Sequence, residues 1–286
     1  MNLADINTIK KFMGEGFAFK KSMGQNFLIN PEVCPQMAAA AADKDTAVLE
    51  IGPGIGVLTY ELSKAASKVV AIELDKSLEN ILSKTLCECK NVEIIYGDAM
   101  KMDLKVLLEE KFSGYKKIAV CANLPYYITS PIITMLLESN LPINNITVMV
   151  QKEAAERICA RVGSRESGAL TICVNYYSES EILFEVNRTS FMPPPKVDSA
   201  VINLKIREKP PVFVKDEKHF FKFIKACFAQ RRKTFLNSVS NTLHIEKSAL
   251  KQVLTELNLD ENIRSEQLTM ENLANIANRI LEYYNN

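Results

Sequence analysis

Short apolar runs alternate with helix-length amphipathic segments through the first two thirds of the chain. Five runs are rich in Val and Ile and apolar at nearly every position, as strands are when helices cover both faces of a sheet. These runs are AVLEI (47–51), KVVAIEL (68–74), VEIIY (92–96), KIAVCA (117–122) and ITVMV (146–150). Helix-length segments such as LTYELSKAA and SLENILSKTLCE lie between them. The alternation predicts an α/β fold with a doubly wound sheet.

The pattern changes after residue 150. KEAAERICARV and ALTICVNYYS predict helices, and SEILFEVN and SAVINLKI predict two strands that could extend the sheet at one edge as an antiparallel pair. REKPPVFV (207–214) predicts a linker, because two adjacent prolines bar regular structure. Beyond it, apolar residues at three-to-four spacing predict a small all-α domain. Its helical segments are HFFKFIKACFAQRRKTFLNSV, EKSALKQVLTEL and MENLANIANRILEYY. We therefore expect two domains, residues 1–207 and 208–286.

The composition is that of a soluble globular protein. The chain has 286 residues, of which 47% are hydrophobic and 24% charged, so it can bury a sizeable core. A net charge of +1 does not by itself indicate a nucleic-acid partner. No run approaches eighteen apolar residues, and no continuous apolar segment follows the first lysines. We therefore expect neither a membrane span nor a secretory signal.

The cysteines predict free thiols. Seven are scattered along the chain, and of these only Cys87 and Cys89 lie close together. No second pair completes a zinc site, and His219 and His244 are the only histidines. The pattern indicates a cytoplasmic protein without a metal, most of whose thiols are packed as small apolar residues.

The segment VLEIGPGIG places glycines at positions 52, 54 and 56, after the first strand and before a helix. A dinucleotide-binding turn has the spacing G-x-G-x-x-G and binds a pyrophosphate. Here the spacing is G-x-G-x-G, and the acidic Glu50 comes before the first glycine. Gly52 and Gly54 would let the backbone approach a ligand closely. The acid points away from a pyrophosphate and suits a ligand with a cationic amino-acid tail.

Two further carboxylates come at the ends of the next two strands. Glu73 closes the second strand and can accept both hydroxyls of a ribose. Asp98 follows the third strand and can accept from the exocyclic amine of an adenine. In strand order the three tips match an amino-acid tail, a ribose and a base, which predicts S-adenosylmethionine (SAM) as cofactor rather than NAD or ATP. The alternative is a simple tight turn, with Glu73 and Asp98 as helix caps.

The fourth strand ends at NLPYYITSPI (123–132). Its NLPY resembles the [DNS]-P-P-[YF] motif of methyltransferases that act on amino groups of nucleic-acid bases. The side-chain carbonyl of Asn123 and the backbone carbonyl of Leu124 could accept the two hydrogens of an aromatic amine and turn its lone pair toward a methyl group. Tyr126 could stack on the base. An ordinary strand exit followed by core aromatic residues is the alternative.

Six segments in order extend the resemblance over nearly the whole chain. They are KKSMGQNFL (20–28), EIGPGIG (50–56), NLPYYITSPI (123–132), QKEAAERI (151–158), FMPPPKVDSAV (191–201) and CFAQRRKTFLN (227–237). Together they resemble the ribosomal RNA adenine dimethyltransferase family, most closely its KsgA-type members.

The resemblance implies a Rossmann-like class I methyltransferase sheet with a small C-terminal all-α domain. It also implies dimethylation, at N6, of two adjacent adenosines in the 3′-terminal hairpin of small-subunit ribosomal RNA. The partner would be that RNA in a pre-ribosomal particle, bound by a monomer with a role in small-subunit biogenesis. The family's cofactor contacts fall on Asn26, Leu28, Gly52, Glu73, Asp98 and Asn123.

A second aromatic residue could close the base pocket. Phe191, opposite Tyr126, would form a sandwich around an extruded adenine. The alternative is that Phe191 is only an edge-strand anchor. We expect Tyr127 to lie in the core, because neighbouring side chains on an extended segment point in opposite directions.

Basic residues are concentrated in two places. Four lysines, Lys10, Lys11, Lys20 and Lys21, lie near the N-terminus. Between residues 215 and 233, seven Lys and Arg face only Asp216 and Glu217, which gives a local charge of +5. Within this run we expect RNA contacts from Lys222, Lys225, Arg231, Arg232 and Lys233. A solvated helix face is the alternative.

Two other functions compete with small-subunit methylation. A related adenine dimethyltransferase acts on large-subunit RNA and confers resistance to macrolides, but GQNFL, NLPYYITSPI and QRRK favour the small-subunit enzyme. A non-catalytic RNA-binding assembly or transcription factor could be built on the same fold. The intact NLPY argues against a purely binding role.

Overall fold

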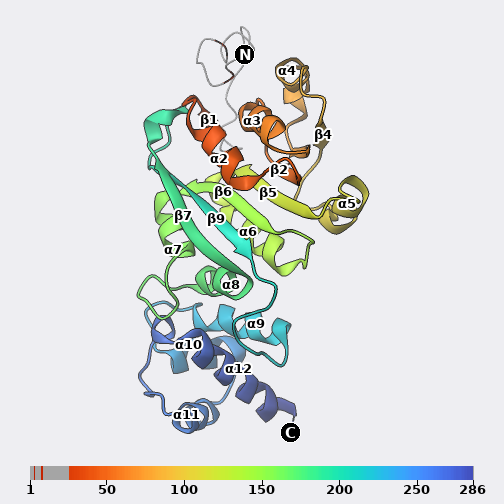
Figure 1. Ribbon diagram of the computed structural model, residues 1–286. Coiled ribbons are helices and arrows are strands. Elements are labelled where there is room, and N and C mark those ends of the chain that lie inside the picture. The colour runs from red at the N-terminus through yellow and green to blue at the C-terminus, as the bar shows by residue number, and fades with distance from the viewer. Residues whose placement is uncertain (1–2, 4–7, 9–25, 286) are drawn as a thin grey trace. The chain divides into compact units, whose positions relative to one another are not determined.

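The computed structural model describes Leu3, Thr8 and residues 26–285. A seven-stranded mixed sheet has the order β4-β3-β2-β5-β6-β9-β7 (Figure 1). The strands are β2 (Thr46–Ile51), β3 (Lys68–Glu73), β4 (Val92–Tyr96), β5 (Lys117–Asn123), β6 (Asn145–Gln151), β7 (Ser178–Val186) and β9 (Ser199–Ile206). Each of the seven strands lies where an apolar run predicted it, within about two residues at either end.

The sheet has a topological switch point beside β2, where successive strands stop adding to one side of the sheet and begin adding to the other. From this strand, β3 and β4 continue to one side and β5 and β6 to the other, and all four neighbouring pairs are parallel. In such sheets ligands bind outside the carboxyl ends of the strands at the point of reversal. Strand β9 then pairs antiparallel with β6, and β7 forms the edge. The predicted extension of the sheet by two strands is thus confirmed.

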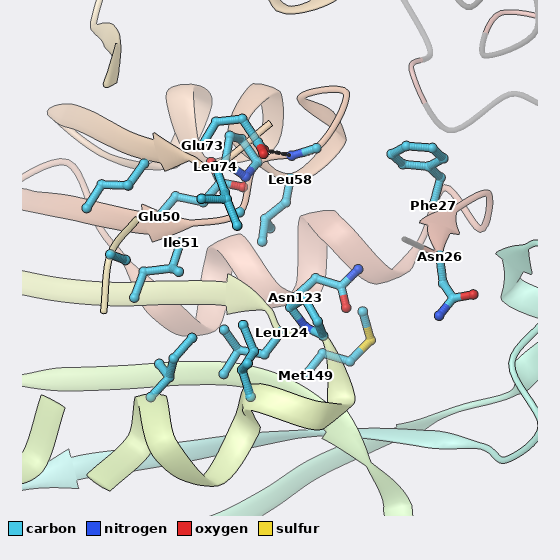
Figure 2. Close-up of a pocket in the computed structure, with 18 of the residues that line it drawn as sticks. Asn26, Phe27, Glu50, Ile51, Leu58, Glu73, Leu74, Asn123, Leu124 and Met149 are labelled. Atoms are coloured by element: carbon cyan, nitrogen blue, oxygen red, sulfur yellow. Dashed lines mark hydrogen bonds between the residues drawn. The ribbon is translucent and has the colours of Figure 1, made fainter. Parts of the chain in front are cut away.

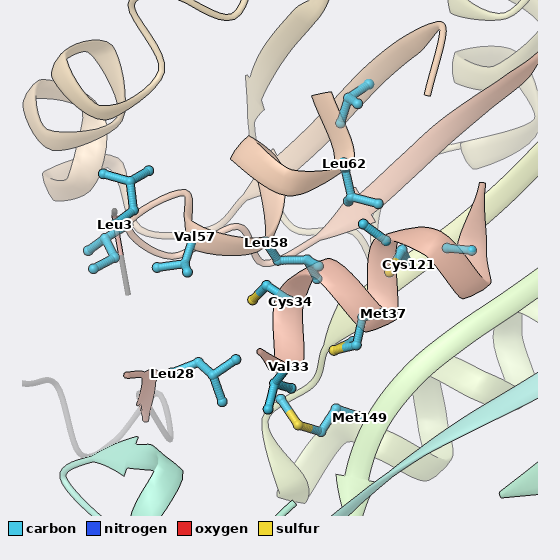
Figure 3. Packing of buried hydrophobic residues seen from close by; sticks show 14 of the residues in the cluster. Leu3, Leu28, Val33, Cys34, Met37, Val57, Leu58, Leu62, Cys121 and Met149 are labelled. Atoms are coloured by element: carbon cyan, nitrogen blue, oxygen red, sulfur yellow. The ribbon is translucent and has the colours of Figure 1, made fainter. Parts of the chain in front are cut away.

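Helices α2 (Val33–Ala41) and α3 (Val57–Ala65) pack against each other beside the sheet. Met37 and Leu62 from these helices and Cys121 from β5 are all fully buried in one apolar cluster (Figure 3). The remaining helical segments of this part are η2 (Lys76–Leu78), α4 (Glu79–Thr85), α5 (Leu104–Lys111), η3 (Tyr126–Ile128), α6 (Thr129–Glu138) and η4 (Arg188–Ser190). All seven cysteines are free thiols, and four of them are buried.

A two-stranded antiparallel sheet joins segments that are distant in sequence. Strand β1 (Phe27–Leu28) pairs with β8 (Phe191–Met192), so that Phe27 faces Met192 and Leu28 faces Phe191. Next to this ladder, the amide of Ile29 donates to the carbonyl of Ser190 at 2.8 Å. The GQNFL and FMPPP motifs are therefore held side by side.

The chain divides into two compact units. One comprises the described residues up to Ala155 together with Glu179–Ile206, and the other comprises Glu156–Ser178 and the described residues from Arg207 onward. The second unit contains α8 (Ala169–Tyr177), α9 (Glu217–Cys227), α10 (Phe235–Leu243), α11 (Lys247–Glu256), η5 (Ser265–Gln267) and α12 (Met270–Asn285). Helix α7 (Lys152–Ile158) spans the first division. The domain boundary at residues 207 and 208 stays a prediction, but packing joins 156–178 to the C-terminal helices.

An aromatic cluster explains why 156–178 packs with these helices. Tyr176 and Tyr177 at the end of α8 contact Phe220 and Phe221 of α9, with ring centroids 5.2–5.5 Å apart. The hydroxyl of Tyr176 also donates to Glu217 at 3.4 Å. Burial and the charge of Glu217 raise the pKa of Tyr176 to about 12.

One predicted helical run is wrong in its continuity. HFFKFIKACFAQRRKTFLNSV forms α9 and α10 with a turn between them, and QRRK (230–233) lies in that turn. The hydroxyl of Ser238 stabilises the break, since it donates to the carbonyl of Ala226 at 2.7 Å and accepts from the amide of Gln230 at 3.3 Å.

Across the described chain, every helix is too short or too polar to cross a membrane.

Candidate active site

One cavity lies at the carboxyl ends of β2, β3, β4 and β5. The open space within and above it measures about 1270 Å³, and apolar side chains make up most of its lining, as in many ligand sites. Every residue predicted to bind cofactor or to act in catalysis lines it: Asn26, Leu28, Gly52, Gly54, Glu73, Asp98, Asn123, Leu124, Tyr126 and Phe191. Segments that are far apart in sequence thus form a single site.

The glycine turn is shaped for close approach. Gly52 has a φ of +74°, and a Cβ atom there would meet no atom within 4 Å, so the backbone faces open space. Gly54 also has a positive φ, +59°, and a Cβ atom would lie 3.3 Å from the ring of Phe27. Both positions favour glycine, because L side chains rarely adopt such φ values.

Glu73 holds the glycine turn from the tip of β3. Its Oε2 accepts from the amide of Gly54 at 3.0 Å (Figure 2), and its Oε1 accepts from the amide of Asp75 at 2.7 Å. Burial raises the pKa of Glu73, and these two backbone hydrogen bonds lower it. The carboxylate therefore has a structural role even without a ligand.

Glu50 lines the cavity as well; the sequence pattern linked this acid to a cationic ligand tail, although it was not among the predicted cofactor contacts. It lies in β2, two residues before Gly52, and is 1% exposed. Burial raises the pKa of Glu50 to about 8, with a further rise from the charge of Glu73. Its Oε2 has no hydrogen-bond partner within the described structure. A buried, unpartnered carboxylate oxygen fits a cationic ligand group.

Asp98, which follows β4, is more exposed than Glu73 at the end of β3. Its Oδ1 accepts from the amide of Met100 at 3.0 Å, and its Oδ2 lies 3.3 Å from the ammonium of Lys101. The carboxylate side chain is 30% exposed. It stabilises the turn after β4 and lines the cavity, but it is not the helix cap of the alternative interpretation, because the N-cap of α5 is Asp103.

The β1–β8 ladder closes another wall. Asn26 directly precedes β1, and Figure 2 shows it beside Phe27, whose ring lies against Gly54. Leu28 is 3% exposed, and so is its partner Phe191, which belongs to the apolar core as well as to the cavity. Phe191 is thus an anchor, and its place in a base sandwich stays a prediction.

The NLPY segment leaves β5 in a hydrogen-bonded turn. Asn123 is the last residue of β5, and the amide of Leu124 donates to the carbonyl of Met149 at 3.3 Å. The hydroxyl of Tyr126 lies 2.8 Å from Oγ of Ser199, the first residue of β9. Burial raises the pKa of Tyr126.

Tyr127 is not a core residue, so this prediction was wrong. Its side chain is 61% exposed and lines the cavity. The reason is local. Residues 126–128 form η3, a 3-10 turn, in which the two-fold alternation of an extended segment does not apply.

The predicted RNA-binding residues Lys222, Lys225, Arg231, Arg232 and Lys233 are all exposed. Lys222 and Lys225 lie on α9, and the other three lie in the turn after it. Lys215, counted in the same basic run, forms an ion pair with Glu282. The lysines at positions 10, 11, 20 and 21 lie outside the described residues.

Another cavity lies within the second compact unit, which we call the helical unit. Three loops that are distant in sequence line it with Arg165, Arg231, Lys233 and Arg264, against one acid, Glu266. The predicted set omitted Arg165 and Arg264, because neither belongs to a basic run in the sequence. Their convergence depends on packing, shown by the hydrogen bond that the guanidinium of Arg264 donates to the backbone carbonyl of Arg231.

Comparison with known proteins gives one consistent result. A family profile described as "Ribosomal RNA adenine dimethylase" matches residues 16–282. "Ribosomal RNA small subunit methyltransferase A" of Geobacillus sp. (strain WCH70) is 47% identical over 269 residues, which are 93% of this chain and 92% of that protein.

Two solved structures are also similar. A dimethyladenosine transferase from Plasmodium falciparum is 30% identical with a TM-score of 0.73, over 91% of this chain and 98% of that one. The 23S rRNA methyltransferase ErmE is 26% identical with a TM-score of 0.66, over 89% and 99%. The sheet is therefore a Rossmann-like methyltransferase sheet, and the chain belongs to the ribosomal RNA adenine dimethylase family.

Proposed function

We propose that this protein transfers methyl groups from SAM to N6 of two adjacent adenosines in the 3′-terminal hairpin of small-subunit ribosomal RNA. The observation that carries the proposal is the single cavity lined by all ten predicted cofactor and catalytic residues. The 47% identical relative, named as a small-subunit methyltransferase, supports the choice of substrate.

The strand tips suit the parts of SAM in order. The unpartnered, buried Oε2 of Glu50 and the open backbone at Gly52 suit the cationic amino-acid tail. Glu73 suits the ribose hydroxyls and Asp98 the adenine amine, while Asn26, Leu28 and Gly54 line the same space. When bound, SAM would supply an electrophilic methyl group on a sulfonium.

The chain's own residues would then orient the target amine. The side-chain carbonyl of Asn123 and the backbone carbonyl of Leu124 would accept its two hydrogens, so that the lone pair of N6 is drawn out of conjugation with the ring and directed at the methyl group. Tyr126, whose hydroxyl is fixed by Ser199, would stack on one face of the adenine. Phe191 would limit the other side of the pocket.

RNA would bind the helical unit through phosphate contacts. The convergence of Arg165, Arg231, Lys233 and Arg264 in one cavity favours an anion there. Lys222, Lys225 and Arg232 would extend the contact over the exposed surface. With a net charge of +1, binding would depend on these local clusters and on the shape of the RNA.

The substrate assignment is tested with radiolabelled SAM, unmethylated small subunits and, separately, large-subunit RNA. We expect label at two adjacent adenosines of the small-subunit RNA. Label only on large-subunit RNA would contradict the proposal and favour the activity named for the 26% identical structure. Binding to small subunits without any transfer would instead indicate a non-catalytic factor.

We also propose that the protein acts as a cytoplasmic monomer.

A further inference from the structure

Three large apolar side chains stand exposed at the mouth of the active-site cavity. Leu74 is 55% exposed, Met100 40% and Tyr127 61%, and all three line the cavity. Exposed apolar side chains gathered at one pocket indicate a surface that a ligand covers. We therefore expect these three side chains to be covered by a part of a ligand that lies outside the cavity itself.

The three residues belong to two sides of the site. Leu74 directly follows Glu73, and Met100 comes two residues after Asp98, so both accompany the carboxylates proposed for the cofactor. Tyr127 instead follows Tyr126 in the turn that begins at the end of β5, where the target base would lie. Tyr127 is thus the exposed apolar residue on the substrate side.

The turn that carries Tyr127 is held by hydrogen bonds on both sides of it. The amide of Ile128 donates to the carbonyl of Pro125 at 3.1 Å, and the Tyr126 hydroxyl is bonded to Ser199. Ser199 is fully buried and lies opposite Gln151 in the β6–β9 ladder. The sheet therefore fixes the backbone from which the ring of Tyr127 projects.

We propose that Tyr127 is a positioning residue that stacks on the nucleobase adjacent to the adenine in the pocket. This inference rests on the proposed function. A base drawn into a pocket leaves its neighbour without a stacking partner on that side, and an exposed aromatic ring at the rim replaces that partner. Because the two target adenosines are adjacent, Tyr127 would hold one of them while the other is methylated.

The test compares variants in methylation of unmethylated small subunits. We expect Tyr127→Ala to raise KM for the particle at least fivefold, with kcat within twofold of wild type and unchanged affinity for SAM. Tyr127→Phe should restore KM because it keeps the ring face. Tyr127→Leu should behave like Tyr127→Ala, since it keeps apolar volume but lacks an aromatic face. Tyr283→Ala, which removes an exposed tyrosine outside the cavity, is the matched control.

Several outcomes would overturn the inference. An unchanged KM in Tyr127→Ala, or full rescue by Tyr127→Leu, would show that stacking does not occur. A loss confined to kcat would place Tyr127 in another role. These results are distinguishable from failure of the proposed function, because in that case the wild-type protein would not methylate small subunits at all.

Discussion

Leu28 and Phe191 lie opposite each other in the β1–β8 ladder, although 163 positions separate them in the chain. Both side chains are 3% exposed and both line the active-site cavity. The segment proposed to contact the cofactor and the segment proposed to close the base pocket therefore form one wall. We therefore expect a substitution of either residue to alter the packing of the other.

Phe191 should contribute to stability and to methyl transfer by separable means. We expect Phe191→Ala to lower the free energy of unfolding by about 3–5 kcal/mol, because it leaves a cavity in the core. Phe191→Leu should cost less than about 1.5 kcal/mol yet still reduce methylation, because it lacks an aromatic face. Denaturant unfolding and methyl transfer to small subunits measure the two effects. Wild-type transfer by Phe191→Leu would leave Phe191 as an anchor only.

Glu73 should be needed for cofactor affinity. We expect Glu73→Ala to weaken SAM binding at least tenfold, about 1.4 kcal/mol, while the fold stays intact. Because Glu73 also accepts from the amide of Gly54, Glu73→Gln is the informative control: it keeps an acceptor for that amide and removes the charge. Calorimetry with unchanged affinity in Glu73→Ala would refute the ribose assignment.

Glu50 should make the ligand-free protein less stable as pH rises. Burial raises its pKa from 4.5 to about 8, so between these values the folded state holds a proton that the unfolded state has lost. Stability from this group is present below pH 4.5 and is lost as pH rises through about 8, a decline on the order of a few kcal/mol. Chemical denaturation at pH 5–8 should show a flatter profile for Glu50→Gln. Parallel profiles would contradict the assignment.

The basic cavity and the exposed Arg232, next to Arg231 in the chain, should supply salt-dependent RNA affinity. We expect Arg231→Ala with Arg232→Ala to weaken binding to small subunits and flatten its dependence on salt, and Arg165→Ala with Arg264→Ala to do the same. Cofactor affinity should not change. Lys84→Ala with Lys90→Ala removes two exposed charges from the other unit and is the control. If the salt dependence of binding is unaltered, these residues do not contact RNA and form only a solvated surface.

The strands and the site could be predicted for the same reason. Runs such as KIAVCA are apolar at nearly every position because helices cover both faces of the inner strands, and the functional residues come at or just after the strand ends. What depended on packing was missed. The break between α9 and α10 rests on Ser238, which an apolar period cannot reveal. Arg165 and Arg264 meet only through the fold, and the exposure of Tyr127 follows from a 3-10 turn in place of an extended segment.

Asn123 carries the central claim, since it separates an enzyme from a binding factor. Its side chain ends β5 and lines the cavity, where it would accept a hydrogen from the adenine amine. Loss of one such contact at a reacting centre commonly costs about a hundredfold or more in rate. Asn123→Asp should be milder than Asn123→Ala, because a carboxylate still accepts from the amine.

The most direct measurement is single-turnover methylation of unmethylated small subunits by Asn123→Ala, with particle binding measured in parallel. We predict a rate at least about a hundredfold below wild type, with particle binding unchanged. A wild-type rate in Asn123→Ala would mean that Asn123 is only a strand-exit residue, and would contradict the proposed role of NLPY.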